Sequence, residues 1–157
     1  MKIKLITVSD AKNIYIDVDG VLLCNRTQDS IDPAIAKYGT EFLEVCLEGH
    51  DCYWLTTHCR DGSVDHVIQR LGRYADPGFM KLARQIKPVT WNTLKTEAID
   101  FTQPFVWVDD DPLDAELDVL RAHNCIHRWL NVNTWKKPDD LFRAMEIIGS
   151  NTPNQTA

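Results

Sequence analysis

The sequence lacks any hydrophobic run long enough to suggest a membrane span. No apolar stretch approaches the roughly 18 residues that cross a bilayer, and the N-terminus alternates Lys and Ile where a signal peptide would build an apolar core. A cytoplasmic location without a membrane partner is therefore the default expectation. The five cysteines are odd in number and include no Cys-x-x-Cys pair, so neither a disulfide framework nor a zinc knuckle is predicted.

The chain also lacks an excess of basic residues. It has 17 Lys and Arg against 23 Asp and Glu, a formal net charge of −6, which argues against a general nucleic-acid coat. The charge is uneven, because residues 60–87 carry six basic and three acidic side chains. We interpret this basic segment as a solvated helix face, with a local anion-steering patch as the alternative.

What remains is the composition of one globular domain. The 157 residues are 44% hydrophobic and 25% charged, without an internal repeat or a low-complexity block. We assign the domain to residues 1–149 and expect the polar tail at 150–157 to be disordered. Short apolar runs alternate with helical patterns, which predicts an α/β, Rossmann-like fold of three layers, with a mostly parallel sheet and helices on both faces.

The expected elements follow from periodicity and from turn and cap signals. Strands are expected at 13–18, 51–57, 104–108 and 126–130, with a possible edge strand at 2–8 and a brief one at 89–91. Helices are expected at 32–48, 64–71, 79–86, 93–101, 111–123 and 139–148. Asp32 and Asp111 each precede a proline, so each is predicted to be a helix N-cap.

Acids and hydroxyls gather where predicted strands end. Because the carboxyl ends of parallel strands meet at one edge of a sheet, we expect these side chains to lie close together. An Asp-x-Asp-Gly turn that merely closes a strand explains the first pair equally well. The residues are Asp17 and Asp19, Thr56 and Thr57, and Asp109 and Asp110.

Lys95 falls in the first turn of a predicted helix, where a cation opposes the helix macrodipole. An exposed lysine reaching water is the simpler explanation of that position taken alone. Oxygen ligands without a His or Cys cluster suit Mg²⁺, which substrate phosphate oxygens often complete. A hydroxyl and a lysine would hold a phosphoryl group, and a carboxylate could attack it to give an aspartyl-phosphate.

These motifs, taken in order, resemble those of the haloacid dehalogenase (HAD) superfamily. The match covers residues 13 to about 130, and a response-regulator receiver fits less well because its acidic pair comes first in the chain, not last. The four matching motifs are Asp-Val-Asp-Gly-Val at 17–21, Trp-Leu-Thr at 54–56, Lys95, and Val-Asp-Asp at 108–110.

The resemblance implies a role for each matched residue. Asp17 is expected to be the nucleophile and a Mg²⁺ ligand. Asp19 is expected to be the general acid and base and to bind the metal through its backbone carbonyl. Thr56 would bond the phosphoryl oxygens, and Lys95 would steady both the nucleophile and the phosphate.

The resemblance leaves two choices among neighbouring residues. In the last motif we expect Asp110 to be the direct metal ligand, with Asp109 behind it or linked through water. Lys87 is an alternative to Lys95 for the third motif, but Lys95 opens a predicted helix just before the strand of the fourth motif, as the family's lysine usually does.

Spacing within the resemblance bears on the substrate. About 37 residues separate Asp19 from Thr56, and about 38 separate Thr56 from Lys95, which leaves no room for a sizeable cap domain. Capless members of the family often act on macromolecules or phosphorylated ends, or close their sites by oligomerising.

The chain is also similar to HAD domains associated with RNA-repair proteins. This implies a Mg²⁺-dependent phosphohydrolase acting on phosphorylated nucleic-acid ends. The alternatives are a phosphatase of a small phosphomonoester and a non-catalytic binding or scaffolding module, and a homo-oligomer or partner protein could cover the open site.

Further residues near the second motif are weaker candidates for substrate binding. Thr57 is grouped with the substrate-binding residues, and Arg60 is the cation expected to reach an extended anionic substrate. Arg70 and Arg73 flank an apolar stripe toward solvent and are weaker candidates for the same contact. His58 could assist, but a histidine in a loop is more often incidental.

The tryptophans are assigned to packing. Trp54 and Trp107 sit within strand runs and are predicted to be core residues. For Trp91 and Trp135, packing is preferred over stacking on a nucleic-acid base.

Overall fold

The central element of the computed structural model, which describes residues 10–25 and 32–149, is a four-stranded parallel sheet. The expected edge strand at 2–8 and the tail at 150–157 lie outside the described residues. In spatial order the strands are β4 (Asp51–Trp54), β1 (Asn13–Ile16), β5 (Phe105–Asp109) and β6 (Trp129–Asn131). The two central strands, β1 and β5, are each paired on both sides, so their carboxyl ends lie in the middle of one sheet edge.

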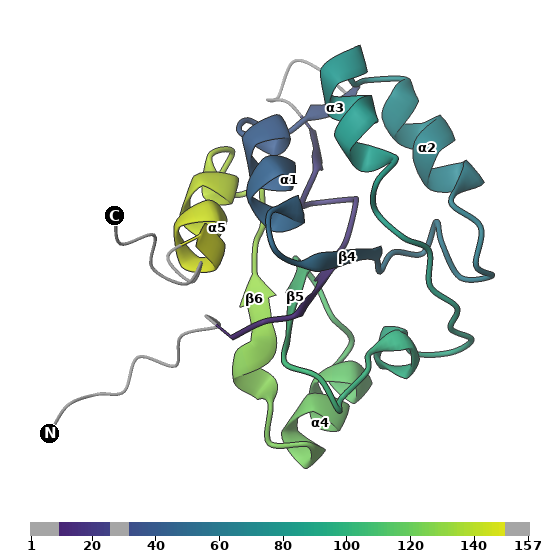
Figure 1. The fold of residues 1–157 in the computed structure, drawn as a ribbon, viewed down its shortest axis with the longest axis vertical. Helices are drawn as coiled ribbons and strands as arrows, with labels where there is room; N and C mark the ends of the chain where they lie inside the picture. Colours follow the sequence, from purple (N-terminus) through teal and green to yellow (C-terminus); the bar gives the residue numbers. More distant parts are fainter. Residues whose placement is uncertain (1–9, 26–31, 150–157) are drawn as a thin grey trace, which may run out of the picture.

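Helices cover both faces of this sheet, which confirms the predicted three-layer α/β architecture (Figure 1). No sizeable cap domain is present in the described part of the chain. On one face lie α1 (Gly39–Leu47), α2 (Asp65–Gly72), α3 (Pro77–Ala83) and α5 (Asp140–Gly149). On the other lie α4 (Asp114–Ala122) and the 3₁₀ turn η1 (Lys95–Ala98), while a second 3₁₀ turn, η2 (Ile126–Arg128), leads into β6.

Successive side chains of a strand point to opposite faces of the sheet, so the hydrophobic core consists of two clusters, one on each face. Ile14 and Ile16 contact the side chains of the larger helical layer, whereas Tyr15 contacts the cluster under α4. Trp54 and Trp107 are fully buried, one in each cluster, which confirms that they are core residues. A sheet buried on both faces leaves its edges as the accessible places for polar chemistry.

The prediction of a helix at 32–48 is wrong for its first part. Pro33–Ile35 forms strand β3, which pairs antiparallel with β2 (Leu23–Asn25), and the helix begins only at Gly39. The fixed φ of proline suits an extended edge strand as well as a first helical turn, so Asp32-Pro33 alone does not distinguish them. The Ala36 amide donates to the Leu22 carbonyl (2.8 Å), which holds this hairpin beside the loop after β1.

The Asp111 N-cap prediction is also wrong. The helix begins at Asp114, and the Leu113 amide donates to Glu116 Oε1 (2.9 Å) at its start. The Asp111 amide instead donates to Asp109 Oδ1 (2.9 Å). The loop after β5 is thus held by its own aspartate.

Three shorter predictions are only partly right. The helix at 93–101 is reduced to η1, and the brief strand at 89–91 is reduced to one isolated bridge, between Asp61 and Thr90. The last strand begins at Trp129, because the preceding residues form η2. These segments are short, so tertiary contacts outweigh their local preferences.

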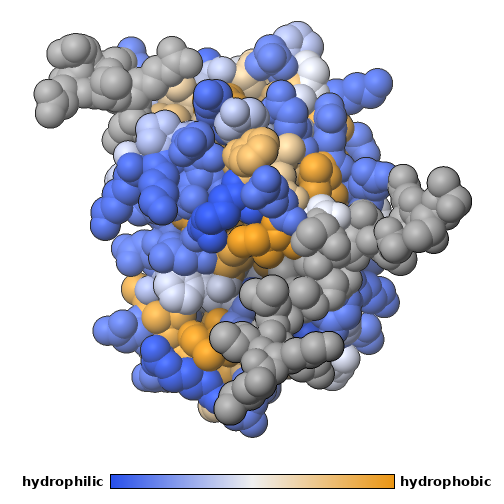
Figure 2. All heavy atoms as spheres, turned by 90° about the vertical axis from the view of Figure 1, so that its left-hand side faces the viewer, coloured by the Kyte–Doolittle hydropathy of each residue, from blue (hydrophilic) through white to orange (hydrophobic). Residues whose placement is uncertain are grey.

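No helix in the described ranges is both long and apolar enough to cross a membrane. On the face turned to the left in Figure 1, hydrophilic side chains predominate and hydrophobic ones show as small patches among them (Figure 2). Within residues 10–25 and 32–149, the large exposed hydrophobic side chains come from separate segments, namely Leu113, Ile126, Trp135 and Phe142.

Candidate phosphate and metal site

Asp17 stands at the point where β1 leaves the sheet. Its amide donates to the Val108 carbonyl of β5 (3.0 Å), so the two central strands end side by side. The carboxyl group is nearly completely buried. The strand pairing therefore fixes Asp17 next to Asp109, the last residue of β5.

The turn after β1 depends on Gly20. Its φ is +79°, a left-handed conformation that favours glycine. A Cβ atom built on Gly20 would lie 2.1 Å from Oδ2 of Asp110, a distance that no side chain tolerates. Gly20 thus permits the backbone of one loop to approach the carboxylate of the other, and any larger residue would displace Asp110.

Three carboxylates converge at this edge of the sheet. Asp17, Asp109 and Asp110 each present an oxygen, and these oxygens lie within 4.8 Å of one another. Lys95, from η1, places Nζ 2.7 Å from Asp109 Oδ2 and 3.5 Å from Asp17 Oδ1. We call these four residues the carboxylate cluster.

Lys95 is held in place by its backbone as well as its side chain. Its amide donates to Glu116 Oε2 of α4 (2.6 Å), and its side chain is only 12% exposed. Burial alone would lower the pKa of Lys95, but Asp17 and Asp109 raise it above its usual range. The lysine is therefore a fixed cation, in contrast with the exposed side chain that its sequence position suggests.

Crowding disfavours the ionised form of two of the carboxyl groups. Burial and the adjacent Asp109 raise the pKa of Asp17 well above its usual range, although Lys95 opposes this effect. Burial and Asp109 likewise raise the pKa of Asp110 to about 6, against an opposing hydrogen bond with Asp17. One ammonium group does not compensate three carboxylates in this partly dry environment.

The donor set fits a hard divalent cation. All three groups offer carboxylate oxygens, no His or Cys belongs to the cluster, and the excess of negative charge is what a divalent ion would neutralise. Asp109 already has both oxygens engaged, by Lys95 and by the Asp111 amide. This arrangement agrees with the expectation that Asp110 is the direct ligand and Asp109 lies behind it, an expectation that stays a prediction.

Asp19 occupies a different environment, although it is only two residues from Asp17. Arg70 of α2 donates to Asp19 Oδ1 from Nη2 (2.6 Å) and Nε (3.1 Å), and His58 Nε2 lies 2.7 Å from Oδ2. We call these three residues the ion-pair cluster. The hydrogen bond with His58 and the pair with Arg70 hold the pKa of Asp19 below its usual range, although burial opposes them.

Neither partner of Asp19 is predicted from the sequence. Arg70 is placed toward solvent, as a weaker candidate for contact with the substrate, and His58 is interpreted as more often incidental, yet both engage the second aspartate of the first motif. The available signal was weak: Arg70 is three residues after the buried Val67 and one before the buried Leu71, at the border of the inward-facing stripe.

The remaining residues predicted to bind substrate differ in burial and in their distance from the two clusters. Thr56 is buried at the end of β4, and its Oγ1 accepts from the His58 amide (3.3 Å), whereas Thr57 is exposed. Arg60 contacts neither cluster: its guanidinium lies over the Trp91 ring, 4.3 Å from the centroid, and donates to the Asn92 carbonyl.

Lys87 is also directed elsewhere. It pairs with Asp51, the first residue of β4, with Nζ 3.2 Å from Oδ1, so it stands near the opposite edge of the sheet, away from the carboxylate cluster to which Lys95 belongs. The basic segment at 60–87 is consequently not one patch, since Arg60, Arg70 and Lys87 have three different surroundings.

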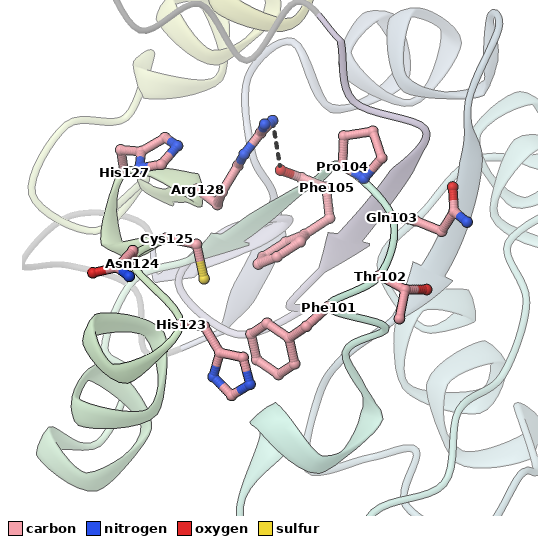
Figure 3. Close-up of a pocket in the computed structure, with 10 residues that line it drawn as sticks. All are labelled: Phe101, Thr102, Gln103, Pro104, Phe105, His123, Asn124, Cys125, His127 and Arg128. Atoms are coloured by element: carbon pink, nitrogen blue, oxygen red, sulfur yellow. Dashed lines mark hydrogen bonds between the residues drawn. The ribbon is translucent and has the colours of Figure 1, made fainter.

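A cavity of about 320 Å³ lies away from this chemistry, at the amino ends of β5 and β6. Residues 101–105 face residues 123–128 across it (Figure 3). Its His123 ring stacks on Phe101 (centroids 3.9 Å apart), and Arg128 is engaged by Asp10 and the Phe105 carbonyl. The described residues that line this cavity include no comparable cluster of charged side chains, so we place the candidate site at the carboxylate cluster.

No protein-family model matches the chain, and neither does any curated protein sequence. Membership of the HAD superfamily therefore stays a prediction that rests on the four motifs.

Proposed function

We propose that the protein is a Mg²⁺-dependent phosphohydrolase that works through an aspartyl-phosphate on Asp17. The observation that carries the proposal is the convergence of Asp17, Lys95, Asp109 and Asp110 at one sheet edge. These residues come from two central strands and a separate 3₁₀ turn. An arrangement that concentrates buried negative charge around one lysine has no evident structural purpose, and it suits a cation and a phosphoryl group.

Each group has a chemical task in this proposal. A carboxylate oxygen of Asp17 attacks phosphorus, and the bond from phosphorus to the ester oxygen breaks as the leaving group takes a proton from Asp19. Water, deprotonated by Asp19, then attacks the acyl phosphate, which releases inorganic phosphate and restores the Asp17 carboxylate. Lys95 neutralises charge beside Asp17 throughout. A metal held by Asp17 and Asp110, with the Asp19 carbonyl, would neutralise the phosphate charge and align it for attack.

The preferred substrate class is a phosphate at a nucleic-acid end, with a small phosphomonoester as the alternative. The lack of a cap domain in the described residues supports a substrate that projects from an open edge. Thr56, at the end of β4, would donate its hydroxyl proton to a phosphoryl oxygen. Closure of the edge by a second copy of the chain or by a partner protein stays a prediction.

One observation favours a second candidate, a phosphate-binding module with little turnover. Asp19 is held by Arg70 and His58, and its lowered pKa favours the deprotonated carboxylate, which cannot supply a proton to a leaving group. Catalysis therefore requires Arg70 or His58 to leave Asp19 when substrate arrives. In a binding module they would stay in place.

The test is Mg²⁺-dependent phosphate release from a panel of substrates. The panel contains an aryl phosphate, nucleotides, sugar phosphates and oligonucleotides phosphorylated at the 3′ or 5′ end. Asp17→Asn removes the nucleophile, and Asp118→Asn is the matched control, because that carboxylate is 73% exposed on α4. Acid-quench trapping of ³²P-labelled protein measures the covalent intermediate directly.

Turnover by the wild-type and Asp118→Asn proteins, with a loss of at least about 10³-fold in Asp17→Asn, is the expected result. Retained activity in Asp17→Asn contradicts the assignment of the nucleophile. Phosphate binding without turnover or trapped label, from folded protein that binds Mg²⁺, supports the binding module.

A further inference from the structure

A second cleft opens directly beside the carboxylate cluster. Its volume is about 250 Å³, and it lies between the end of β6 and the start of α5. Asp110 forms part of its wall, so the cleft and the cluster share one carboxylate. Its other lining residues include Asn131, Asn133, Lys136, Lys137 and Arg143.

The loop that carries the two lysines is fixed by its own hydrogen bonds. Asn133 Oδ1 accepts from the amides of Trp135 and Lys136 (both 3.0 Å), and the Asn133 carbonyl accepts from the amide of Lys137 (3.0 Å). The Thr134 amide donates to the Gly20 carbonyl (2.8 Å). The loop is therefore anchored to the turn of the first motif, and its lysines are held beside the proposed reaction centre.

The cleft is basic once its internal pairs are counted. Arg143 donates to Asp140 Oδ1 (2.9 Å) and to the Asn131 carbonyl, so this arginine is already engaged. Burial raises the pKa of Asp140, but its hydrogen bonds and cationic neighbours, chiefly Arg143, together outweigh this effect and lower the pKa, so the carboxylate stays ionised and paired. Lys136 and Lys137 form no salt bridge within the residues that the structure describes. Besides the pair of Arg143 and Asp140, the lining holds two lysines against one carboxylate, Asp110, so a net positive charge remains for a ligand in a protein of net charge −6.

We propose that this cleft binds a second phosphate group of the substrate, on the leaving-group side of the phosphate that is removed. The inference rests on the proposed function, because Asp110 joins the cleft to the carboxylate cluster. Two lysines and the two asparagine amides match the charge and hydrogen-bonding capacity of a phosphate dianion or phosphodiester. A lone monoester would leave these groups without a partner, so the protein prefers substrates that carry two phosphates.

The second phosphate has two chemical sources. It can be the internal phosphodiester next to a phosphorylated oligonucleotide end, or the other phosphate of a small bisphosphate. Trp135, on the same loop, is 52% exposed and donates from Nε1 to the Leu23 carbonyl (3.3 Å). Its exposed ring surface adjoins the lysines in sequence and would favour the oligonucleotide, because bases stack on such surfaces.

The experiment compares matched substrates with one and two phosphates. Phosphate release with Mg²⁺ is measured for an aryl phosphate, a nucleoside 3′-phosphate, a dinucleotide 3′-phosphate, a sugar monophosphate and a sugar bisphosphate. The proteins are wild type, the double variant Lys136→Gln with Lys137→Gln, and Lys81→Gln, an exposed lysine of α3 whose replacement controls for the loss of a surface charge away from the cleft. Binding of the same ligands to Asp17→Asn with Mg²⁺ is measured by calorimetry.

We expect kcat/KM for the two-phosphate member of a pair to exceed that of its partner by about tenfold, since each exposed ammonium contributes modestly. The preference falls to below about threefold in the double variant and at 0.5 M salt. It is unchanged in Lys81→Gln. A preference in the dinucleotide pair identifies the phosphodiester as the source, and a preference in the sugar pair identifies the bisphosphate.

The outcomes separate this inference from the proposed function. Hydrolysis of the aryl phosphate without any two-phosphate preference overturns the cleft assignment alone. If nothing is hydrolysed, the proposed function fails. In that case lysine-dependent binding of a two-phosphate ligand to Asp17→Asn upholds the cleft, and equal binding of both members of each pair overturns it.

Discussion

Asp17 and Asp19 are only two residues apart, yet their surroundings shift their pKa values in opposite directions. Asp17 is buried against two further carboxylates with one lysine among them, and its pKa is raised. Asp19 is half-buried between Arg70 and His58, and its pKa is lowered. The carboxylate cluster has too little positive charge, whereas the ion-pair cluster has enough for its single acid. A pattern of residue types does not determine such a difference; the elements that pack around each side chain do.

The comparison also indicates where each cluster obtains stability. In the carboxylate cluster, ionisation opposes folding unless a metal cation is bound in addition to Lys95, so the proposed function and stability are in conflict. In the ion-pair cluster, ionisation favours folding, and the proposed mechanism requires these pairs to be broken before Asp19 can act as an acid. The following changes shift these balances separately.

The largest expected effect is that of removing the one cation of the carboxylate cluster. Lys95→Met leaves Asp109 buried and unpaired and should lower the free energy of unfolding by about 3 kcal/mol, or about 9 °C in Tm. Because the remaining carboxyl groups repel one another more as they ionise, the loss should be greater at pH 8 than at pH 5. Urea denaturation with EDTA measures it, and Lys81→Met is the control. Adding Asp109→Asn to the variant should recover part of the loss; equal losses at both pH values would contradict this account.

The next effect concerns the metal. Asp110→Asn should raise the Mg²⁺ concentration needed for half-maximal stabilisation by at least tenfold, or about 1.4 kcal/mol, because it removes the expected direct ligand. Asp109→Asn should change it less, since Lys95 and the Asp111 amide already engage that carboxylate. Thermal unfolding across a Mg²⁺ titration provides the measurement, and Asp111→Asn controls for the loss of a nearby charge. A larger effect at Asp109 would reverse the assignment of the ligand.

The fold and the carboxylate cluster follow from local patterns in the sequence. Short apolar runs define β1, β4 and β5, and acids that follow such strands must meet at one edge when the strands are parallel. The position of Lys95, unfavourable at the start of a helix, does not by itself distinguish a functional lysine from an exposed one, and Lys95 is selected only through its place among the four motifs. The hairpin at Pro33–Ile35 was missed because proline suits an edge strand as well as a helix start.

The ion-pair cluster could not be predicted in the same way. Its partners are 39 and 51 positions from Asp19 along the chain, and no periodicity relates them. Arg70 reaches Asp19 because α2 lies beside the turn after β1, which depends on how the connections pack. Likewise, Arg60 resembled a substrate-binding cation from its position, but the ring of Trp91 provides a closer partner.

A smaller effect, of opposite sign to the first, is expected at Asp17. Asp17→Asn removes a carboxyl group whose folded-state pKa is raised, and such a group loses stability as pH rises through that pKa. In EDTA at pH 8, the variant should therefore be more stable than the wild type by about 1 kcal/mol. The gain should shrink toward pH 5. Urea denaturation at the two pH values measures it, and a gain that does not change with pH would contradict the raised pKa.

The smallest effect is expected at Asp19, where the sign reverses again. Asp19→Asn should lower the free energy of unfolding by about 0.5 kcal/mol, since the carboxylate is 37% exposed and solvent screens its pairs. A lowered pKa contributes stability above the unfolded-state value and loses it only as pH falls through the folded-state value, so the part of the loss that comes from the pair with Arg70 should be constant between pH 5.5 and 8. A double-mutant cycle with Arg70→Gln isolates the coupling, and 0.5 M salt should weaken it. If Asp19→Asn and Asp17→Asn instead showed the same sign and the same pH dependence, the two aspartates would share one environment, and the separation into two clusters would not hold.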